Sequence, residues 1–226
     1  MAIGEETYGG YICVAVSLNA LDDKQLIEAI ESKAREMRDK VNKKAPDGKI
    51  RSKELIYWNN LGGELAQRAV ESYLYSLIKE HNVKARIISQ VPQIYDYQTH
   101  RDIIIEVNGI MKTLEVRSSF NYKTSFERVL SGAFSLIGPY RTSYKGKEPD
   151  KDFYITVVHR CENWEIENKL KNNVKAYIAG GASKEIFEEY GTKEMLKQEG
   201  AEYLIIRPIN SVVGVPTLFK EILEIK

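Results

Sequence analysis

Alternating apolar and polar residues around Asn108-Gly109 predict a β-hairpin over residues 101–120. Asn and Gly both tolerate the positive φ angles of a type I′ turn, and β-forming residues flank them on both sides. With a two-residue loop, Val107 pairs with Ile110. Stepping outward along both strands then places Asp102 opposite Glu115. The pattern therefore predicts the hairpin and also which side chains meet across it.

The two faces of this hairpin differ in character, because successive side chains of a strand point to opposite sides of the sheet. One face is apolar and is expected to join the core. The other face brings Asp102 and Glu115 to about 5 Å between Cβ atoms, with Arg117 two residues further along. Two carboxylates at this distance destabilise a fold unless positive charge lies between them, and a divalent cation with oxygen ligands supplies such charge. The predicted core face contains Ile103, Ile105, Val107, Ile110, Leu114 and Val116, with Lys112 near the turn.

Helical and strand-like patterns alternate through the rest of the chain. Apolar residues at helical spacing predict one helix over residues 24–44 and another that opens at Trp58 and runs to about residue 80. Their order with the strands predicts an α/β fold with a mixed sheet, in which residues 201–208 form a buried parallel strand. The other predicted elements are strands at 84–91, 153–158 and 175–179, and helices at 125–137, 163–172, 184–190, 193–199 and 217–225.

Asp102, the apolar strand behind it and Glu115-Val116-Arg117 resemble the D…(D/E)-x-K signature of the PD-(D/E)XK, or restriction-endonuclease-like, nuclease superfamily. The resemblance covers residues 60–160, where the predicted element order matches the αβββαβ core of that superfamily. It implies a restriction-endonuclease-like core with a mixed central sheet flanked by helices. The sequence departs from the signature twice: His100-Arg101 stands where a proline often precedes the aspartate, and Arg117 stands where lysine is usual.

Length and composition fit one medium α/β domain, or a core domain with an extension, and the resemblance implies a single nuclease domain. The chain has 226 residues, of which 43% are hydrophobic, enough for a substantial core. We expect an N-terminal helical part (1–56), a catalytic core (57–160) and a C-terminal α/β extension (161–226). The net charge of +1 neither requires nor excludes a nucleic-acid partner, because phosphate binding needs a local basic surface rather than a basic total.

The cysteines and the N-terminal region suggest an intracellular protein. Cys13 and Cys161 belong to no C-x-x-C or Cys/His cluster, so the sequence indicates neither a zinc site nor a disulfide framework. The apolar run at residues 11–18 is too short to cross a bilayer and lacks a basic lead-in. We expect no membrane association and a cytoplasmic, nucleoid-associated location.

The resemblance implies metal-dependent hydrolysis of phosphodiester bonds in DNA. Asp102 and Glu115 would hold Mg²⁺, or Mn²⁺ in its place, together with the main-chain carbonyl of Val116. Such a metal lowers the pKa of bound water and neutralises charge on the reacting phosphate. Arg117 would stabilise that developing charge. It cannot serve as the base, because guanidinium does not deprotonate in proteins.

Glu64 is a fourth candidate for the active site. It directly follows Gly62-Gly63, and archaeal resolvase-like members of the superfamily carry a glycine-led helix whose glutamate joins the site. The helix dipole favours a first-turn glutamate in any case, so both interpretations stay open.

Polar and basic residues around the hairpin are candidates for DNA contacts. Basic side chains interleaved with aromatic ones in the loop 140–152 can clamp a nucleic acid strand, although acidic residues in the same loop also fit a solvated surface. Gly180-Gly181 before Ser183 lacks both the G-x-G-x-x-G spacing and the Walker lysine, which favours a tight strand-to-helix turn over a phosphate loop. The candidate DNA-binding residues are His100, Arg101, Ser118, Ser119, Lys123, Arg141 and Lys145.

Within the superfamily, the length of the chain and its C-terminal extension favour a sequence-specific type II restriction endonuclease. Such enzymes act on double-stranded DNA, and a homodimer would match a palindromic site. The alternatives are a DNA repair or Holliday-junction-resolving nuclease, and a nucleic-acid-binding protein whose nuclease site has decayed. Arg117 in place of lysine is consistent with the last of these.

Overall fold

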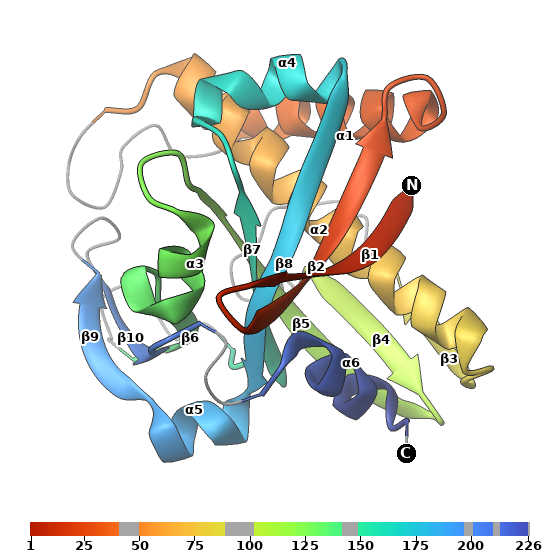
Figure 1. Ribbon diagram of the computed structural model, residues 1–226, viewed down its shortest axis with the longest axis vertical. Coiled ribbons are helices and arrows are strands. Elements are labelled where there is room, and N and C mark those ends of the chain that lie inside the picture. Colours follow the sequence, from red (N-terminus) through yellow and green to blue (C-terminus); the bar gives the residue numbers. More distant parts are fainter. Residues whose placement is uncertain (41–49, 89–101, 142–148, 197–200, 210–212, 226) are drawn as a thin grey trace.

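The computed structural model describes residues 1–40, 50–88, 102–141, 149–196, 201–209 and 213–225, which form two sheets and the helices around them (Figure 1). The larger sheet has the strand order β1-β2-β8-β7-β5-β4-β3, and the smaller has the order β6-β10-β9. The predicted α/β fold with a mixed central sheet flanked by helices is confirmed. The strands are β1 (Ala2–Tyr8), β2 (Tyr11–Asn19), β3 (Ala85–Ile88), β4 (Ile103–Val107), β5 (Ile110–Phe120), β6 (Leu136–Tyr140), β7 (Phe153–His159), β8 (Asn173–Ser183), β9 (Thr192–Leu196) and β10 (Ala201–Ile206).

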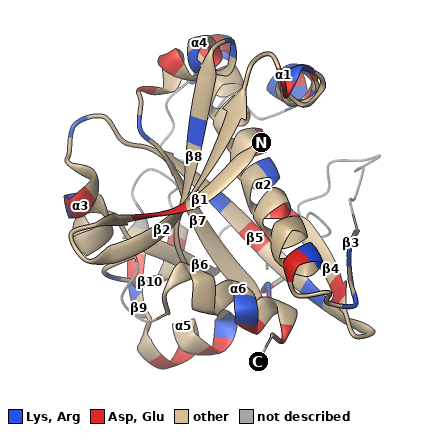
Figure 2. Cartoon of the chain, turned by 45° about the vertical axis from the view of Figure 1, so that its right-hand side comes forward, with Lys and Arg blue, Asp and Glu red and all other residues tan. Residues whose placement is uncertain are grey.

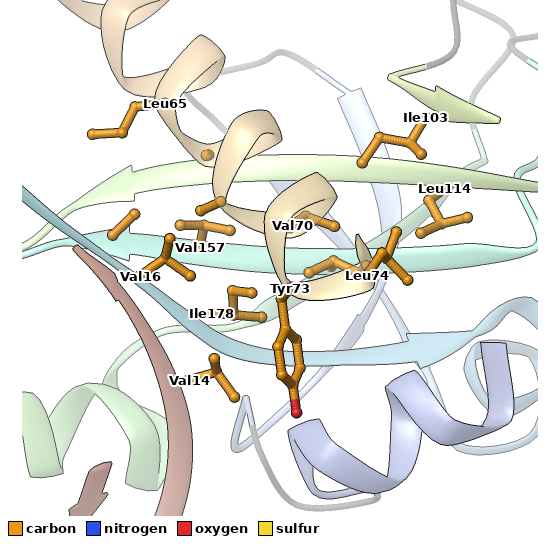
Figure 3. Packing of buried hydrophobic residues seen from close by; sticks show 14 of the residues in the cluster. Val14, Val16, Leu65, Val70, Tyr73, Leu74, Ile103, Leu114, Val157 and Ile178 are labelled. Carbon is orange, nitrogen blue, oxygen red and sulfur yellow. The ribbon is translucent and has the colours of Figure 1, made fainter. Parts of the chain in front are cut away.

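Different layers cover the two faces of the large sheet. On one face, α2 (Lys53–Glu80) and α6 (Val215–Leu223) share a large apolar cluster with the strands, and α1 (Lys24–Lys40) packs against α2. Figure 3 shows Leu65, Val70 and Leu74 of α2 in one apolar cluster with strand residues such as Ile103 and Leu114. The opposite face is covered by α3 (Phe126–Arg128), the small sheet and α5 (Lys184–Tyr190). A short 3-10 turn (Asn163–Glu165) leads into α4 (Ile166–Leu170). None of the described helices is both long and apolar enough to cross a membrane.

The hairpin has the predicted register. Val107 pairs with Ile110 and Ile103 pairs with Leu114. Asn108 and Gly109 have φ angles of 51° and 87°, the positive values that a type I′ turn requires. Outside the hairpin, β3 continues the antiparallel meander on one side and β7 runs parallel to β5 on the other. Along the chain, α2, β3, β4, β5, α3 and β7 therefore make a helix, three antiparallel strands, a helix and a parallel strand, with β6 inserted before β7.

Helix α2 begins at Lys53 rather than at Trp58, because Ser52 caps it: the Ser52 hydroxyl accepts a hydrogen bond from the Leu55 amide at 3.1 Å. Gly62 and Gly63 therefore lie inside the helix and do not lead it. A Cβ on Gly62 would come within 2.6 Å of the Phe120 ring. The glycine allows α2 to pass close over the end of β5.

The N-terminal part adds two strands to the sheet. β1 and β2 form an antiparallel hairpin, and β2 pairs with β8. Alternate residues of β2 face the two apolar clusters, with Val14 and Val16 on the α2 side and Cys13 and Ala15 on the other. Residues 1–56, expected to be a helical part, thus also extend the central sheet.

The predicted helix at 125–137 is wrong in its second half. Three α-helical residues and a π-helical turn (Val129–Ala133) are followed by strand β6. Gly132 has a φ of 127°, which no helix accommodates, and the segment after it pairs with β10. Pro139 is tolerated in β6 because this strand lies at the edge of the small sheet.

The predicted helix at 193–199 is also wrong over its described residues, since β9 pairs there with β10. β10 is buried as expected, but it is the middle strand of an antiparallel sheet and not a parallel strand. Gly180 and Gly181 lie within β8 rather than in a turn. A Cβ on Gly181 would meet the Leu218 side chain of α6 at 2.4 Å, so close packing explains this glycine.

Candidate functional site

Charged side chains gather on the face of β5 that is turned away from α2. Glu115 and Arg117 alternate with the core residues Leu114 and Val116, and β5 carries acidic and basic positions in an otherwise largely uncharged group of central strands (Figure 2). They line a shallow hollow that is open to solvent. The hollow is lined by Glu115, Arg117, Tyr140, Pro149, Asp150, Lys151 and Tyr154.

Asp102 lies immediately before β4, and its carboxylate bonds to the neighbouring strand: Oδ2 accepts a hydrogen bond from the Val116 amide at 2.7 Å. Burial of the carboxyl group raises the pKa of Asp102 to about 7, and the negative charge of Glu115 adds to this effect. The Val116 amide and the charges of Arg117 and Lys151 act in the opposite direction. The predicted proximity of Asp102 and Glu115 therefore has an electrostatic consequence in the structure.

Two cations surround Glu115. The Arg117 guanidinium lies 3.4 Å from Oε1 and the Lys151 ammonium lies 3.9 Å from Oε2. The Arg117 guanidinium carbon is also 4.7 Å from the centre of the Tyr203 ring, a cation–π contact that β10 of the small sheet provides. The C-terminal part of the chain thus helps to hold a residue of the site.

Lys151 is the site residue that the sequence prediction missed. It is only 4% exposed and precedes β7, whose first residue, Phe153, pairs with Leu114 of β5. In a parallel pair, both strands begin at the same edge of the sheet. Lys151 comes near Glu115 through this parallel pairing of β7 with β5, for which the local sequence pattern gives no signal.

Helix α2 contacts the Asp102 end of β4 through Gln67 rather than Glu64. The Gln67 amide nitrogen donates hydrogen bonds to the main-chain carbonyl of Asp102 at 2.9 Å and to the Glu71 carboxylate at 3.0 Å. Glu71 is buried and pairs with Arg68 at 2.7 Å. Burial raises the pKa of Glu64, while nearby Arg68 and Lys33 lower it. The charges around Glu64 thus belong to α1 and α2.

The candidate DNA-binding residues are dispersed. Ser118 and Ser119 lie on β5 beside β7, and Lys123 is exposed with its ammonium 5.0 Å from the Tyr122 ring. Arg141 borders the hollow indirectly, because it pairs with Asp150 at 3.2 Å. His100, Arg101 and Lys145 lie outside the described residues. The structure therefore groups Asp102, Glu115 and Arg117. Arg141 is connected with the hollow through its ion pair with Asp150.

The acidic residues of the site are few. Within the described ranges, no three His, Cys, Asp or Glu side chains come together as a ligand set. Among the described residues, Asp102 and Glu115 are therefore the carboxylates that could hold a metal together.

The fold and the site together define an α/β protein that holds a partly buried cluster of acidic and basic side chains on one face of a mixed sheet. No protein-family model and no solved structure matches the chain. The chain is 32% identical over 219 aligned residues to the uncharacterized protein MJECS01 of Methanocaldococcus jannaschii, and the match covers 84% of this chain and 78% of the relative. The chain belongs to the same protein family as MJECS01.

Proposed function

We propose that this protein is a metal-dependent endonuclease that hydrolyses phosphodiester bonds in DNA. The observation that carries the proposal is the proximity of Asp102 to Glu115, close enough for the charge of Glu115 to raise the pKa of Asp102. Arg117 and Lys151 contact Glu115, and these three residues line the open hollow. Perturbed carboxylates beside fixed cations are typical of sites that handle phosphate charge.

The donor atoms of the site fit Mg²⁺ or Mn²⁺. Asp102 and Glu115 would hold the metal with the carbonyl of Val116, since hard cations prefer oxygen ligands and Mg²⁺ commonly binds through one or two carboxylates plus water and substrate phosphate. When bound, the metal would supply Lewis acidity and a more acidic water molecule.

The protein's own residues would bind and orient the scissile phosphate. Arg117 presents its guanidinium at the hollow, and the Tyr203 ring restricts where that group can lie. A fixed guanidinium stabilises charge that develops on the phosphate without reorganising during the reaction. The hollow is open to solvent, so we expect a phosphate of a DNA strand that lies outside it to approach Arg117.

The order of helices and strands supports DNA as the substrate, because it agrees with the order that the resemblance to the PD-(D/E)XK superfamily implies. The succession of helix, antiparallel meander, helix and parallel strand is the αβββαβ order that the PD-(D/E)XK superfamily implies, with β6 as an insertion. We propose a restriction-endonuclease-like core and, for a chain of this length, a sequence-specific enzyme that acts as a homodimer on double-stranded DNA. A repair or junction-resolving nuclease is distinguished by cleavage of branched DNA independently of sequence.

One observation favours a second function, nucleic-acid binding without cleavage. Arg117 and Lys151 already contact both oxygens of Glu115, so protein cations alone offset part of the acidic charge. A decayed nuclease site would retain such cations as phosphate contacts. Binding of DNA in the presence of Mg²⁺ or Mn²⁺ without any cleavage would select this function.

Digestion of genome-sized DNA by the purified protein with Mg²⁺ or Mn²⁺ tests the proposal. Discrete bands indicate a sequence-specific enzyme, a smear indicates a general nuclease, and intact DNA contradicts the proposed cleavage. Asp102→Ala should abolish cleavage while the fold remains intact by circular dichroism. Glu106→Gln is the matched control, because Glu106 lies on the same strand but pairs with Arg86 at 2.9 Å, away from the hollow.

A further inference from the structure

Lys151 combines burial with a loose ionic contact. Its side chain is 5% exposed, and its ammonium lies 3.0 Å from the Pro149 carbonyl but 3.9 Å from Glu115 Oε2. An ammonium has three donors, and the carbonyl bond uses one of them. The ammonium can therefore leave Glu115 for another partner while it keeps its hydrogen bond to the Pro149 carbonyl.

The main chain around Lys151 is fixed to the sheet. The Lys151 amide donates a hydrogen bond to the Tyr154 hydroxyl at 2.9 Å, and Tyr154 is the β7 residue paired with Glu115. The Tyr154 ring is itself buried edge-on against Phe187 at 5.4 Å. Strands β5 and β7 thus set the position from which the flexible lysine side chain reaches the hollow.

We propose that Lys151 is the exchangeable cation of this site: it pairs with Glu115 when no metal is bound and turns to the scissile phosphate when Glu115 becomes a metal ligand. This role rests on the metal site of the proposed function. Arg117 is less suited to such an exchange, because the Tyr203 ring holds its guanidinium in place. The lysine lies outside the D…(D/E)-x-K signature and enters the hollow from the segment before β7.

In this exchange, Lys151 competes with the metal for Glu115 and also stabilises charge on the reacting phosphate. Because both cations seek Glu115, removing the ammonium should strengthen metal binding to the protein without DNA, since the two interactions are linked. Removing it should also weaken cleavage, because a charge that stabilises the reacting phosphate is lost. A lysine with only a structural role would not produce these opposite signs.

Calorimetric titration of the full chain with Mn²⁺ in the absence of DNA tests whether metal binding becomes tighter. A DNA cleavage assay tests whether the reaction becomes slower. We expect Lys151→Met to bind Mn²⁺ about 5-fold more tightly or better and to cleave about 100-fold more slowly. Lys175→Met is the matched control, because Lys175 pairs with Glu6 at 2.9 Å and neither residue lines the hollow. It should leave both measurements unchanged.

The outcomes separate this role from the proposed function. Lys151→Gln provides a second variant if Lys151→Met fails to fold by circular dichroism. Unchanged or weaker Mn²⁺ binding in the folded variant overturns the exchange, as does a wild-type protein that binds no Mn²⁺. If Mn²⁺ binding tightens as expected while the wild type cleaves no DNA, the competition of Lys151 with the metal for Glu115 stands, and both its role at the scissile phosphate and the nuclease proposal fail.

Discussion

Two clusters of paired charges at the β3–β4–β5 meander differ in how far their side chains are exposed to solvent. Glu106 of β4 pairs with Arg86 of β3 at 2.9 Å, with side chains that are 35% and 74% exposed. Glu115 of β5 lies beside Arg117 and Lys151, which are 18% and 5% exposed, and its charge acts on Asp102. Water screens the first group, whereas the protein surrounds the second. Exposure, more than charge, thus separates a surface ion pair from a site with perturbed chemistry.

The largest expected effect comes from Asp102→Asn. The variant keeps an oxygen that can accept the Val116 amide hydrogen bond but loses the negative charge. Cleavage should fall by about 10²–10³-fold or more, because a charge essential to the transition state is lost. The free energy of unfolding at pH 8 should rise by about 1 kcal/mol, since a partly buried charge beside Glu115 is removed. Denaturant titration measures this gain, and a destabilised variant would contradict it.

The next largest effect concerns the pH dependence of the free energy of unfolding, which should differ between Asp102 and Glu106. The pKa of Asp102 is raised in the folded protein, so between about pH 4 and its folded value near 7 the native state binds more protons than the unfolded state. The free energy of unfolding should therefore fall as pH rises through this window, by about 1–3 kcal/mol. Asp102→Asn should lack that fall, whereas Glu106→Gln should retain it. Urea titrations at several pH values would show a flat wild-type profile if this account of Asp102 is wrong.

Cleavage should follow pH in the opposite direction over the same range. A carboxylate must be deprotonated to bind a metal, so activity should increase as pH rises through the pKa of Asp102. Stability and activity thus oppose each other at one residue. A cleavage rate that does not change between pH 5.5 and 8, at a Mg²⁺ concentration well below saturation, would remove Asp102 from the proposed metal ligands.

A smaller effect should come from Tyr203, which connects the small sheet with the site. Tyr203→Leu removes the ring face over Arg117 and should slow cleavage about 10-fold, the range expected from a cation–π contact. Tyr203→Phe keeps a ring face and should retain most of the activity. Equal losses in both variants, with melting temperatures matched, would show that the ring does not position Arg117.

The hairpin was predictable from sequence because its determinants are local. Asn108-Gly109 fixes the turn, the turn fixes the register, and the register places Asp102 near Glu115. The second half of the helix predicted at 125–137 and the described part of the helix predicted at 193–199 were wrong because both segments pair with β10. β6 is distant from β10 along the chain, and such pairing leaves no periodic signal of its own, whereas β9 directly precedes β10 and its strand pairing overrides the local helical pattern.

The site was predictable only in the part that the hairpin carries. Lys151 is distant from Glu115 in sequence and reaches it through the parallel pairing of β5 with β7. Gln67 was passed over in favour of Glu64, because a glutamate is the more conspicuous residue chemically. Its contact with Asp102 depends on how α2 crosses the sheet, which is set in part by the close approach of Gly62 to Phe120.

The smallest expected effect belongs to the exposed pair. A double-mutant cycle with Arg86→Ala and Glu106→Gln should give a coupling energy of about 0.2–1 kcal/mol that decreases with added salt, because both side chains are largely solvated. The cycle with Lys151→Met and Glu115→Gln should give a larger coupling that salt screens less, since Lys151 is buried. Chemical denaturation at low and high salt measures both. Equal coupling energies with equal salt dependence would mean that burial does not distinguish the Lys151–Glu115 pair from the Arg86–Glu106 pair, and that Glu115 lies in no specialised environment.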